Sequence, residues 1–399
     1  MAILGNMPRS LINLMLAILR KKFNATNLPK DARTLLKTPT RVGLEIKPIS
    51  GGDFWYQGIE TVMQKYFHYC EFWSKACLFK VFLCWRIHKT RKQDVIIADR
   101  HHLNDLGVTK KLFQDLIKHT FYQFRRWSPQ ENKSMTNYLI KTRLPSEIHR
   151  RMRNLKNVNF WKGSEFRTFL HYISPVALKD FMLDIPYNHF LLYFCGVTIF
   201  SSSAHQHLWL LAKKFLETFV KDFSKYYGRA HLTSNVHNLQ HVYGDVAKFG
   251  QLDDFSAYCF ENHLQFVKRT VRSGRKVAAQ VAGRTQELAT IETAANCTVL
   301  KYPQLKANGV GLHVTAHFVL LPNFKDQWFL TTDNGIVKFL DAKRIYSSLP
   351  TIIGIQYNSW TELFSVSVDD DLNGTEELKL SSTDINIYKL SGLCPSRKV

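Results

Sequence analysis

One carboxylate, Glu261, stands at the start of a stretch that ends in positive charge, FENHLQFVKRTVRSG at residues 260–274. A carboxylate on a helix can be one ligand of a metal-dependent nuclease, because acidic side chains hold the Mg²⁺ ions that act on a phosphate. It can also be an ordinary surface acid, since an acid near a helix start and cations near its end suit the helix dipole. The stretch alone leaves both interpretations open.

The residues around Glu261 have helical spacing. One face is apolar and predicts a buried row of Phe260, Leu264, Val267 and Val271. Polar residues one position further along form a neighbouring stripe, and Ser273-Gly274 is typical of a helix stop. Five cations in and after this stretch are candidate contacts for a polyanion, namely Lys268, Arg269, Arg272, Arg275 and Lys276.

Two further pairs have the spacing of metal ligands. His237 and His241 lie four residues apart on an expected helix, so that both imidazoles could meet one metal ion. The run between them, N-L-Q, offers no third ligand, and we interpret the pair mainly as polar packing around the helix of Glu261, with a metal site as the alternative. Asp99 and His102 are interpreted first as hydrogen bonding at a helix start and second as metal ligands.

Positive charge is concentrated in the first part of the chain. The 399 residues include 54 Lys and Arg against 32 Asp and Glu, a net charge of +22. Residues 1–160 hold 29 of these cations and 11 of the acids, whereas residues 283–399 hold 11 and 12. Lys and Arg release counterions when they bind phosphates, so this distribution favours a nucleic acid as partner. A generally basic protein without such a partner is the alternative.

The seven cysteines are odd in number and contain no C-x-x-C pair, which argues against a disulfide framework and a zinc knuckle. We therefore expect a reducing intracellular compartment, nuclear or cytoplasmic. The strongest candidate for a membrane span, residues 66–88, contains Glu71, Lys75 and Lys80, which are costly inside a bilayer. We expect a soluble protein with no membrane partner.

The elements that position these residues change character along the chain. Residues 103–290 have helical periodicity almost throughout, whereas residues 295–399 contain short stretches rich in β-branched and aromatic residues. This predicts an α+β protein with a mainly helical central domain and a small C-terminal antiparallel β domain, a barrel or a sandwich. Residues 1–62 form an N-terminal segment that Pro and Gly residues interrupt. Residues 63–102 form an aromatic and basic junction without a clear pattern of secondary structure.

Individual elements can be predicted within this outline. Gly228 and Gly250 are expected to end helices, and Asp369-Asp370-Asp371 is expected to be a solvated loop, with calcium binding as a remote alternative. The helices are predicted at residues 107–126, 130–142, 161–172, 175–182, 187–202, 204–226, 232–248 and 260–285. The strands are predicted at residues 311–321, 327–332, 335–340, 351–357, 363–368 and 385–390.

Several blocks, in one order, resemble the CACTA-type (En/Spm-like) transposases of animal genomes. The strongest block is residues 227–274, which is similar to a family pattern that runs N-V-H-x-L-x-H, then F-G-x-L-x-x-F-S, then P-F-E-N. ADRHHLNDLGVTKKL at 98–112 matches another block, and LPKDARTLLKTP at 28–39 resembles the segment before the catalytic core. The remaining blocks are LPSEIHRRMRNL, FWKGSEFRTFLHYISPVAL and YNHFLLYF. The β-rich tail resembles the small tail domain of this family.

The resemblance implies an RNase H-like nuclease with an Asp-Asp-Glu trio and two Mg²⁺ ions, in which Glu261 takes the position of the third acid. It also implies that Asp99 and His102 are a supporting pair. The segment with the first two acids is shortened here to residues 61–98, which offer Glu71 and Asp94 without a strand context. Cys259 replaces the usual proline before the phenylalanine-glutamate pair.

The resemblance therefore implies an internally deleted transposase derivative, the helical domain being a remnant of its core. We expect DNA binding without strand cleavage, no bound cofactor, and Mg²⁺ only if the protein is active. Self-association or pairing with a full-length transposase would be further partnerships. The alternatives are a protein-interaction module, a transposon relic without a function, and an active nuclease that uses Asp94 or Asp99 as substitute acids.

Overall fold

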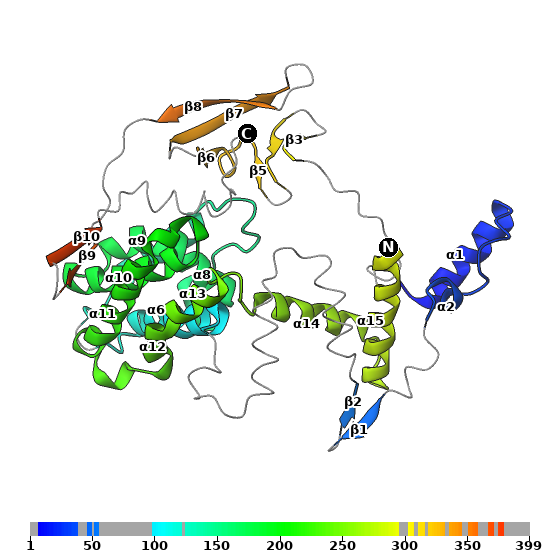
Figure 1. Ribbon diagram of the computed structural model, residues 1–399, viewed down its shortest axis with the longest axis horizontal. Coiled ribbons are helices and arrows are strands. Elements are labelled where there is room, and N and C mark those ends of the chain that lie inside the picture. Colours follow the sequence, from blue (N-terminus) through cyan, green and yellow to red (C-terminus); the bar gives the residue numbers. More distant parts are fainter. Residues whose placement is uncertain are drawn as a thin grey trace. The chain divides into compact units, whose positions relative to one another are not determined.

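The chain divides into two compact units (Figure 1). Unit 1 combines Met1–Trp73 with Tyr258–Leu300, and unit 2 combines Ser74–Ala257 with Lys301–Val399. The computed structural model describes residues 7–38, 46–49, 52–55, 98–121, 124–294, 302–306, 310–315, 318–331, 335–344, 350–357, 366–370 and 374–378. Within these ranges no helix has both the length and the hydropathy that a membrane crossing requires. The candidate span at 66–88 lies outside them, as do Glu71 and Asp94.

Unit 1 is built from two segments that are far apart in the sequence. The first supplies helices α1 (Arg9–Lys22) and α2 (Ala32–Leu35) and the antiparallel ribbon of β1 (Lys47–Ile49) and β2 (Gly52–Phe54). The second supplies α14 (Tyr258–Thr270) and α15 (Val277–Ala294). A small apolar core joins them and consists of Ile12, Leu16, Ala32, Leu36 and Leu288. Because this core is small, polar contacts have a larger share in holding the unit together.

Unit 2 has a helical core made from short and long helices in succession. The long helices α10 (Asp184–Phe200) and α11 (Trp209–Tyr227) lie side by side at its centre (Figure 1). Gly196 permits their close approach, because a Cβ at this position would come 2.7 Å from the Leu216 side chain. The other α-helices are α6 (Lys110–Lys118), α7 (Pro129–Lys141), α8 (Gly163–Thr168), α9 (Ser174–Ala177), α12 (Ser234–Asn238) and α13 (Val242–Phe249). The π and 3-10 segments are η2 (Arg100–Thr109), η3 (Leu155–Phe160), η4 (Phe169–Ile173), η5 (Leu178–Asp180), η6 (Ser203–Leu208), η7 (Arg229–His231) and η8 (Leu239–His241).

A buried guanidinium ties several of these helices together. The side chain of Arg100, 1% exposed, lies 3.2 Å from an oxygen of Asp253 and donates to Ser201 Oγ at 2.6 Å. Its other terminal nitrogen contacts His171 Nε2, which must therefore be unprotonated. Arg167 donates to the second oxygen of Asp253 at 2.7 Å. Burial by itself would raise the pKa of Asp253, but the two guanidiniums outweigh burial and lower it.

The C-terminal part of unit 2 consists of antiparallel strands, and its two three-stranded sheets share a second small core. One three-stranded sheet contains β3 (Gln304–Leu305), β4 (Leu312–His313) and β5 (Val319–Leu320). The other contains β6 (Trp328–Leu330), β7 (Ile336–Lys343) and β8 (Thr351–Tyr357), and a ribbon pairs β9 (Val366–Asp370) with β10 (Gly374–Leu378). The core residues are Leu312, Phe318, Leu320, Phe339 and Ala342. The predicted α+β class, with a helical core and small antiparallel sheets, is confirmed.

Several element predictions are confirmed and others are wrong. Helix α11 ends before Gly228 and α13 before Gly250, whose φ angles are +89° and +91°. The single strand predicted at 311–321 is instead the antiparallel pair β4 and β5. Asp369 and Asp370 belong to β9 and not to a loop, while Asp371 and the strand predicted at 385–390 lie outside the described residues. The boundary between the units, at residues 257 and 258, falls inside the predicted domain 103–290.

Candidate nucleic-acid interface

Helix α14 carries Glu261 in its first turn and Lys268 and Arg269 in its last turn. The three side chains are exposed, and their order suits the helix dipole, with the acid at the positive end and the cations at the negative end. The helix begins at Tyr258, one residue before Cys259, so the absence of a proline at position 259 does not prevent a helix from starting here.

The helix predicted over 260–285 is wrong as a single element. It is interrupted at residues 271–276, so Arg272, Arg275 and Lys276 belong to the connection between α14 and α15. Gln280 holds this connection, because its side chain accepts from Arg272 N at 2.8 Å and donates to the carbonyls of Ser273 at 3.0 Å and Arg275 at 2.7 Å. The predicted stop at Ser273-Gly274 is therefore the place where the chain turns, and three cations are exposed there.

The apolar row of α14 is not the buried face that the spacing predicted. Phe260 is 46% exposed and Leu264 is 53% exposed. A helical period alone does not create a core, because the second surface must also be present to cover the apolar face. In unit 1 the described core uses α1, α2 and α15, with Leu288 as the contribution of α15.

Three arginines of unit 1 are gathered around one buried carboxylate. Glu287 has no exposed side-chain surface and forms ion pairs with Arg9 at 3.1 Å and Arg284 at 2.6 Å. The hydroxyl of Thr38 donates to the same oxygen of Glu287 as Arg9 does. Arg272 donates to the Met7 carbonyl at 2.6 Å, just before Arg9 in the chain. We call Arg9, Arg272, Arg284 and Glu287 the arginine cluster.

The arginine cluster contains more positive than negative charge. Burial lowers the pKa of the Arg272 guanidinium, and the positive charges of Arg284 and Arg9 lower it further, against the opposing effect of Glu287. The cluster holds three guanidiniums against one carboxylate, and Arg9 Nε is a buried donor without a hydrogen-bond acceptor in the described structure.

Asp99 serves as a helix cap at the start of η2. Its carboxylate accepts from the backbone N–H groups of His101 at 3.2 Å and His102 at 2.9 Å, and it contacts His102 Nδ1 at 2.5 Å. It also accepts from Ala257 N at 2.7 Å, which fixes the chain just before the boundary of unit 2. These four contacts match the helix-start interpretation of the D-x-x-H pair.

His237 and His241 come together, but not as buried packing. Their rings lie edge to face with centroids 5.6 Å apart, on α12 and at the end of η8. Both side chains are exposed. The helix of Glu261 belongs to unit 1, so packing of the two histidines around that helix stays a prediction. Within each unit taken by itself, no three His, Cys, Asp or Glu side chains of the described residues bring ligand atoms within 4.8 Å of one another.

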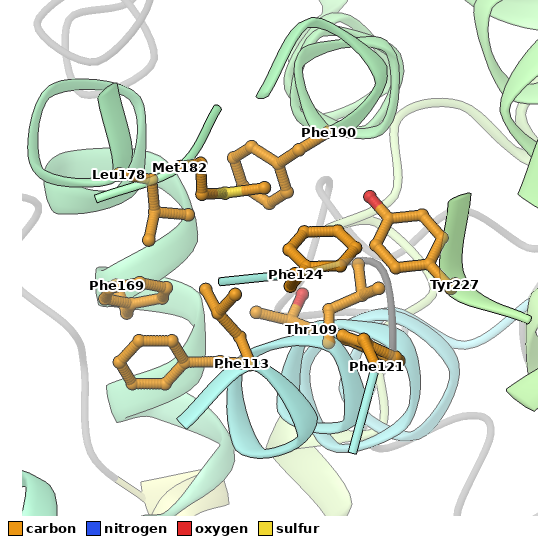
Figure 2. Close-up of a pocket in the computed structure, with 11 residues that line it drawn as sticks. Thr109, Phe113, Phe121, Phe124, Phe169, Leu178, Met182, Phe190 and Tyr227 are labelled. Carbon is orange, nitrogen blue, oxygen red and sulfur yellow. The ribbon is translucent and has the colours of Figure 1, made fainter. Parts of the chain in front are cut away.

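An apolar cavity in the helical core of unit 2 is a packing gap and no ligand site. It measures about 20 Å³, room for a single water molecule. Aromatic rings dominate its lining, among them Phe113, Phe169 and Phe190 (Figure 2). The hydroxyl of Thr109, one of the few polar groups there, is hydrogen-bonded to Tyr193 at 2.8 Å. A nucleobase or a cofactor does not fit this space.

The exposed cations could be identified from the sequence, but Glu287, the centre of the arginine cluster, could not. Arg9 and Thr38 stand 278 and 249 positions before Glu287 in the sequence. The local signal that was present is the pair Arg284 and Glu287, which stands at i and i+3 in an alanine-rich helix. Such a pair is common on exposed helices, so its burial could not be read from the spacing.

Comparisons with known proteins give no relative of this chain. No protein-family model, no curated protein and no solved structure matches it.

Proposed function

We propose that this chain is a transposase-derived DNA-binding protein without strand-cleavage activity, of the CACTA type that its sequence resembles. The observation that carries the proposal is the charge of unit 1. Its described residues include 14 Lys and Arg against 5 Asp and Glu. At the end of α14 and in the connection that follows, Lys268, Arg269, Arg275 and Lys276 are all exposed. A surface of this kind suits the phosphate backbone of a duplex.

The proposed binding is electrostatic and has little sequence preference. Each cation that neutralises a phosphate releases a condensed counterion, and the affinity falls steeply as salt rises. Phosphate contacts fix position on the duplex but carry no base information. We therefore expect similar affinities for unrelated duplexes of equal length, and a nuclear location would follow from such a partner.

The test replaces the four exposed cations together, as Lys268→Gln, Arg269→Gln, Arg275→Gln and Lys276→Gln. Fluorescence anisotropy with a labelled duplex at several salt concentrations should show weaker binding and a log–log salt slope reduced by roughly three to four. The matched control removes four exposed cations of unit 2, as Lys141→Gln, Arg143→Gln, Arg150→Gln and Arg151→Gln. Equal losses in the two variants would mean that overall charge, and no particular surface, binds DNA.

Strand cleavage is not expected with Mg²⁺ or Mn²⁺. In-line attack on a phosphodiester by two metals requires several carboxylates around the ions, and the shortened segment before Asp99 lacks the family's first two acids. A supercoiled-plasmid assay should show no nicking, and Glu261→Gln should change the free energy of unfolding by no more than about 1 kcal/mol. Nicking that disappears in Glu261→Gln would support the alternative of an active enzyme, with Asp94 and Asp99 as the first acids to replace.

A second candidate function, self-association, is favoured by the outer face of α1. Five large apolar residues of α1 and Phe23 directly after it are at least 36% exposed. The five are Leu11, Leu14, Met15, Ile18 and Leu19. Light scattering after gel filtration tests it with Leu14→Ser plus Ile18→Ser. The control is Leu183→Ser plus Leu210→Ser, which changes two equally exposed residues of unit 2. A mass that falls only in the α1 variant supports self-association, and a monomeric wild type excludes it.

A further inference from the structure

We propose that Phe160 is a stacking platform for one unpaired base of single-stranded DNA, with Lys156 and Lys162 beside it for the neighbouring phosphates. Such a site goes beyond duplex binding by unit 1, because it lies on unit 2 and takes a base as well as the backbone. Phe160 is the last residue of η3, and its side chain is 70% exposed. Single exposed apolar residues are common on protein surfaces, so the way in which this ring is held and its surroundings decide its role.

The backbone that carries Phe160 is fixed by a buried carboxylate. Arg153 donates to the Phe160 carbonyl at 2.5 Å and forms two hydrogen bonds of 2.6 Å with Glu165, whose side chain has no exposed surface. The same carboxylate accepts from Lys162 N at 2.8 Å, so the chain is held on both sides of the ring. A platform fixed in this way loses little conformational freedom when a base stacks on it, which lowers the free-energy cost of binding.

The period of η3 explains why Phe160 faces solvent. A 3-10 helix has three residues per turn, so every third residue shares a face. Leu155, Val158 and Trp161, the last directly after the helix, belong to the core of unit 2 and are 6%, 5% and 3% exposed. Phe160 lies outside this face, together with Asn157, which is also exposed. The buried side chains hold the turn against the core, and the ring of Phe160 stays at the surface.

The chain around Phe160 is positively charged. Lys156, in the same 3-10 helix, and Lys162, two residues after the ring, are both exposed. Residues 153–164 contain three Lys and Arg and no Asp or Glu. Cations that follow the phosphates beside an aromatic ring that stacks on a base are the features of single-strand sites. Paired bases are stacked on one another, so an unpaired base fits this ring and a duplex does not. The choice of DNA rests on the function proposed above.

The test measures the anisotropy of a labelled oligothymidylate of about 12 nucleotides with the full chain. Phe160→Ala should weaken binding about tenfold at fixed salt with an unchanged salt slope, because it removes stacking and no phosphate contact. Phe160→Leu keeps apolar volume without an aromatic face and should lose nearly as much. Phe160→Trp should bind at least as tightly as the wild type, since its ring is larger. The matched control is Phe324→Ala, which removes a 73% exposed phenylalanine of the same unit and should leave the affinity unchanged.

A second probe separates the base from the backbone. An oligomer of the same length with abasic sites throughout keeps the phosphates, and the wild type should bind it about tenfold more weakly than oligothymidylate. Phe160→Ala should not weaken that binding further. Lys156→Gln together with Lys162→Gln should reduce the log–log salt slope by about 1.4 with either probe, because two phosphate contacts of a single strand are lost.

The outcomes that overturn the platform are distinct from those that overturn duplex binding. Wild-type affinity of Phe160→Leu, equal losses in Phe160→Ala and Phe324→Ala, or an equal effect of Phe160→Ala on the abasic probe each overturn stacking. Failure of the wild type to bind oligothymidylate at low salt overturns it as well, even if a duplex binds. Tighter binding of oligouridylate RNA, with the same dependence on Phe160, overturns the assignment to DNA. Phe160-dependent binding of oligothymidylate without any binding of a duplex supports the platform and contradicts the function proposed for unit 1.

Discussion

At the scale of residues, Glu287 determines how unit 1 holds its charge. Replacing it as Glu287→Gln would leave Arg9 and Arg284 in place without their common acid. Loss of one partner of a buried ion pair typically costs about 3–5 kcal/mol, because the remaining charge is desolvated and uncompensated. We expect amide hydrogen exchange in α1 and α15 to accelerate by roughly a hundredfold or more, since exchange reports the local opening free energy.

The control for this substitution is Glu217→Gln on α11. Glu217 is 45% exposed and lies 3.7 Å from Lys213 in an i,i+4 pair. Exposed pairs of this kind contribute about 0.5 kcal/mol or less, so exchange in α11 should change little. Unchanged protection of α1 and α15 in Glu287→Gln would show that the buried acid does not organise the unit.

A second residue-scale prediction concerns His189, which is buried beside Phe219 and Tyr227. Burial lowers its pKa to about 4, and the ring lies 3.1 Å from the Phe219 carbonyl and 3.4 Å from the Tyr227 hydroxyl. The folded protein thus keeps the imidazole neutral, whereas an unfolded chain protonates it near pH 6.5. Because the unfolded state takes up more protons between these values, lowering the pH from 7 to 4 removes up to about 3 kcal/mol of stability.

This pH dependence is measured by urea unfolding at a series of pH values. His189→Gln should flatten the loss of stability between pH 6.5 and 4, whatever its effect at pH 7. The exposed residue His149 provides the matched substitution, His149→Gln, which should leave the slope as in the wild type. An unaltered slope in His189→Gln would mean that other groups cause the acid sensitivity.

At the scale of elements, alanine substitutions at two glycines, one inside α13 and one directly after it, should change the free energy of unfolding in opposite directions. Gly250 has φ +91°, and a Cβ there would meet the Asp254 side chain, so Gly250→Ala should destabilise unit 2 by about 1–2 kcal/mol. Gly244 lies inside α13 with no atom within 4 Å of an added Cβ. Gly244→Ala should therefore stabilise by about 0.5–1 kcal/mol. Thermal unfolding of both variants measures the two changes in stability. Changes of the same sign would contradict the backbone conformation assigned to the two glycines.

The same elements show which features of the fold could be predicted from the sequence. Helix ends were predictable where a glycine adopts a left-handed conformation, as at Gly228 and Gly250, because that signal is local. The pair β4 and β5 was missed because the turn between them has no Gly, Pro or Asn that would mark it. The exposed apolar row of α14 was also missed, since periodicity shows which residues share a face but not whether anything covers it.

The candidate site was predictable to a similar degree. Lys268 and Arg269 could be placed at the end of a helix, because the order of charge along the chain is local information. The arginine cluster could not be foreseen, because it depends on two segments of unit 1 meeting across more than two hundred residues. Burial of Glu287 follows from that meeting, and no residue adjacent to it in the sequence indicates it.

At the scale of the whole molecule, unit 1 exists only as an association of separated segments. Its apolar core takes Ile12 and Leu16 from α1 and Leu288 from α15, and its polar centre takes Arg9 and Thr38 from the first segment. Unit 2 has its own and much larger core, within which α10 and α11 are packed. The two units should consequently differ in their dependence on the first 38 residues.

Removal of residues 1–38 tests this dependence. Without α1 and α2, Leu288 loses its apolar partners and Glu287 loses Arg9 and Thr38, so α15 should become exchange-labile while α10 and α11 keep their protection. Hydrogen exchange followed by mass spectrometry resolves the helices within one experiment, and the unit 2 helices are the internal reference.

A milder version replaces Ile12 and Leu16 by alanine, which removes core volume without shortening the chain. Each replacement should lower the free energy of local opening of α15 by at most about 2–5 kcal/mol. Protection of α15 that survives the truncation would mean that its stability comes from elsewhere than the first segment. The arginine cluster would then not depend on α1 for its arrangement on α15.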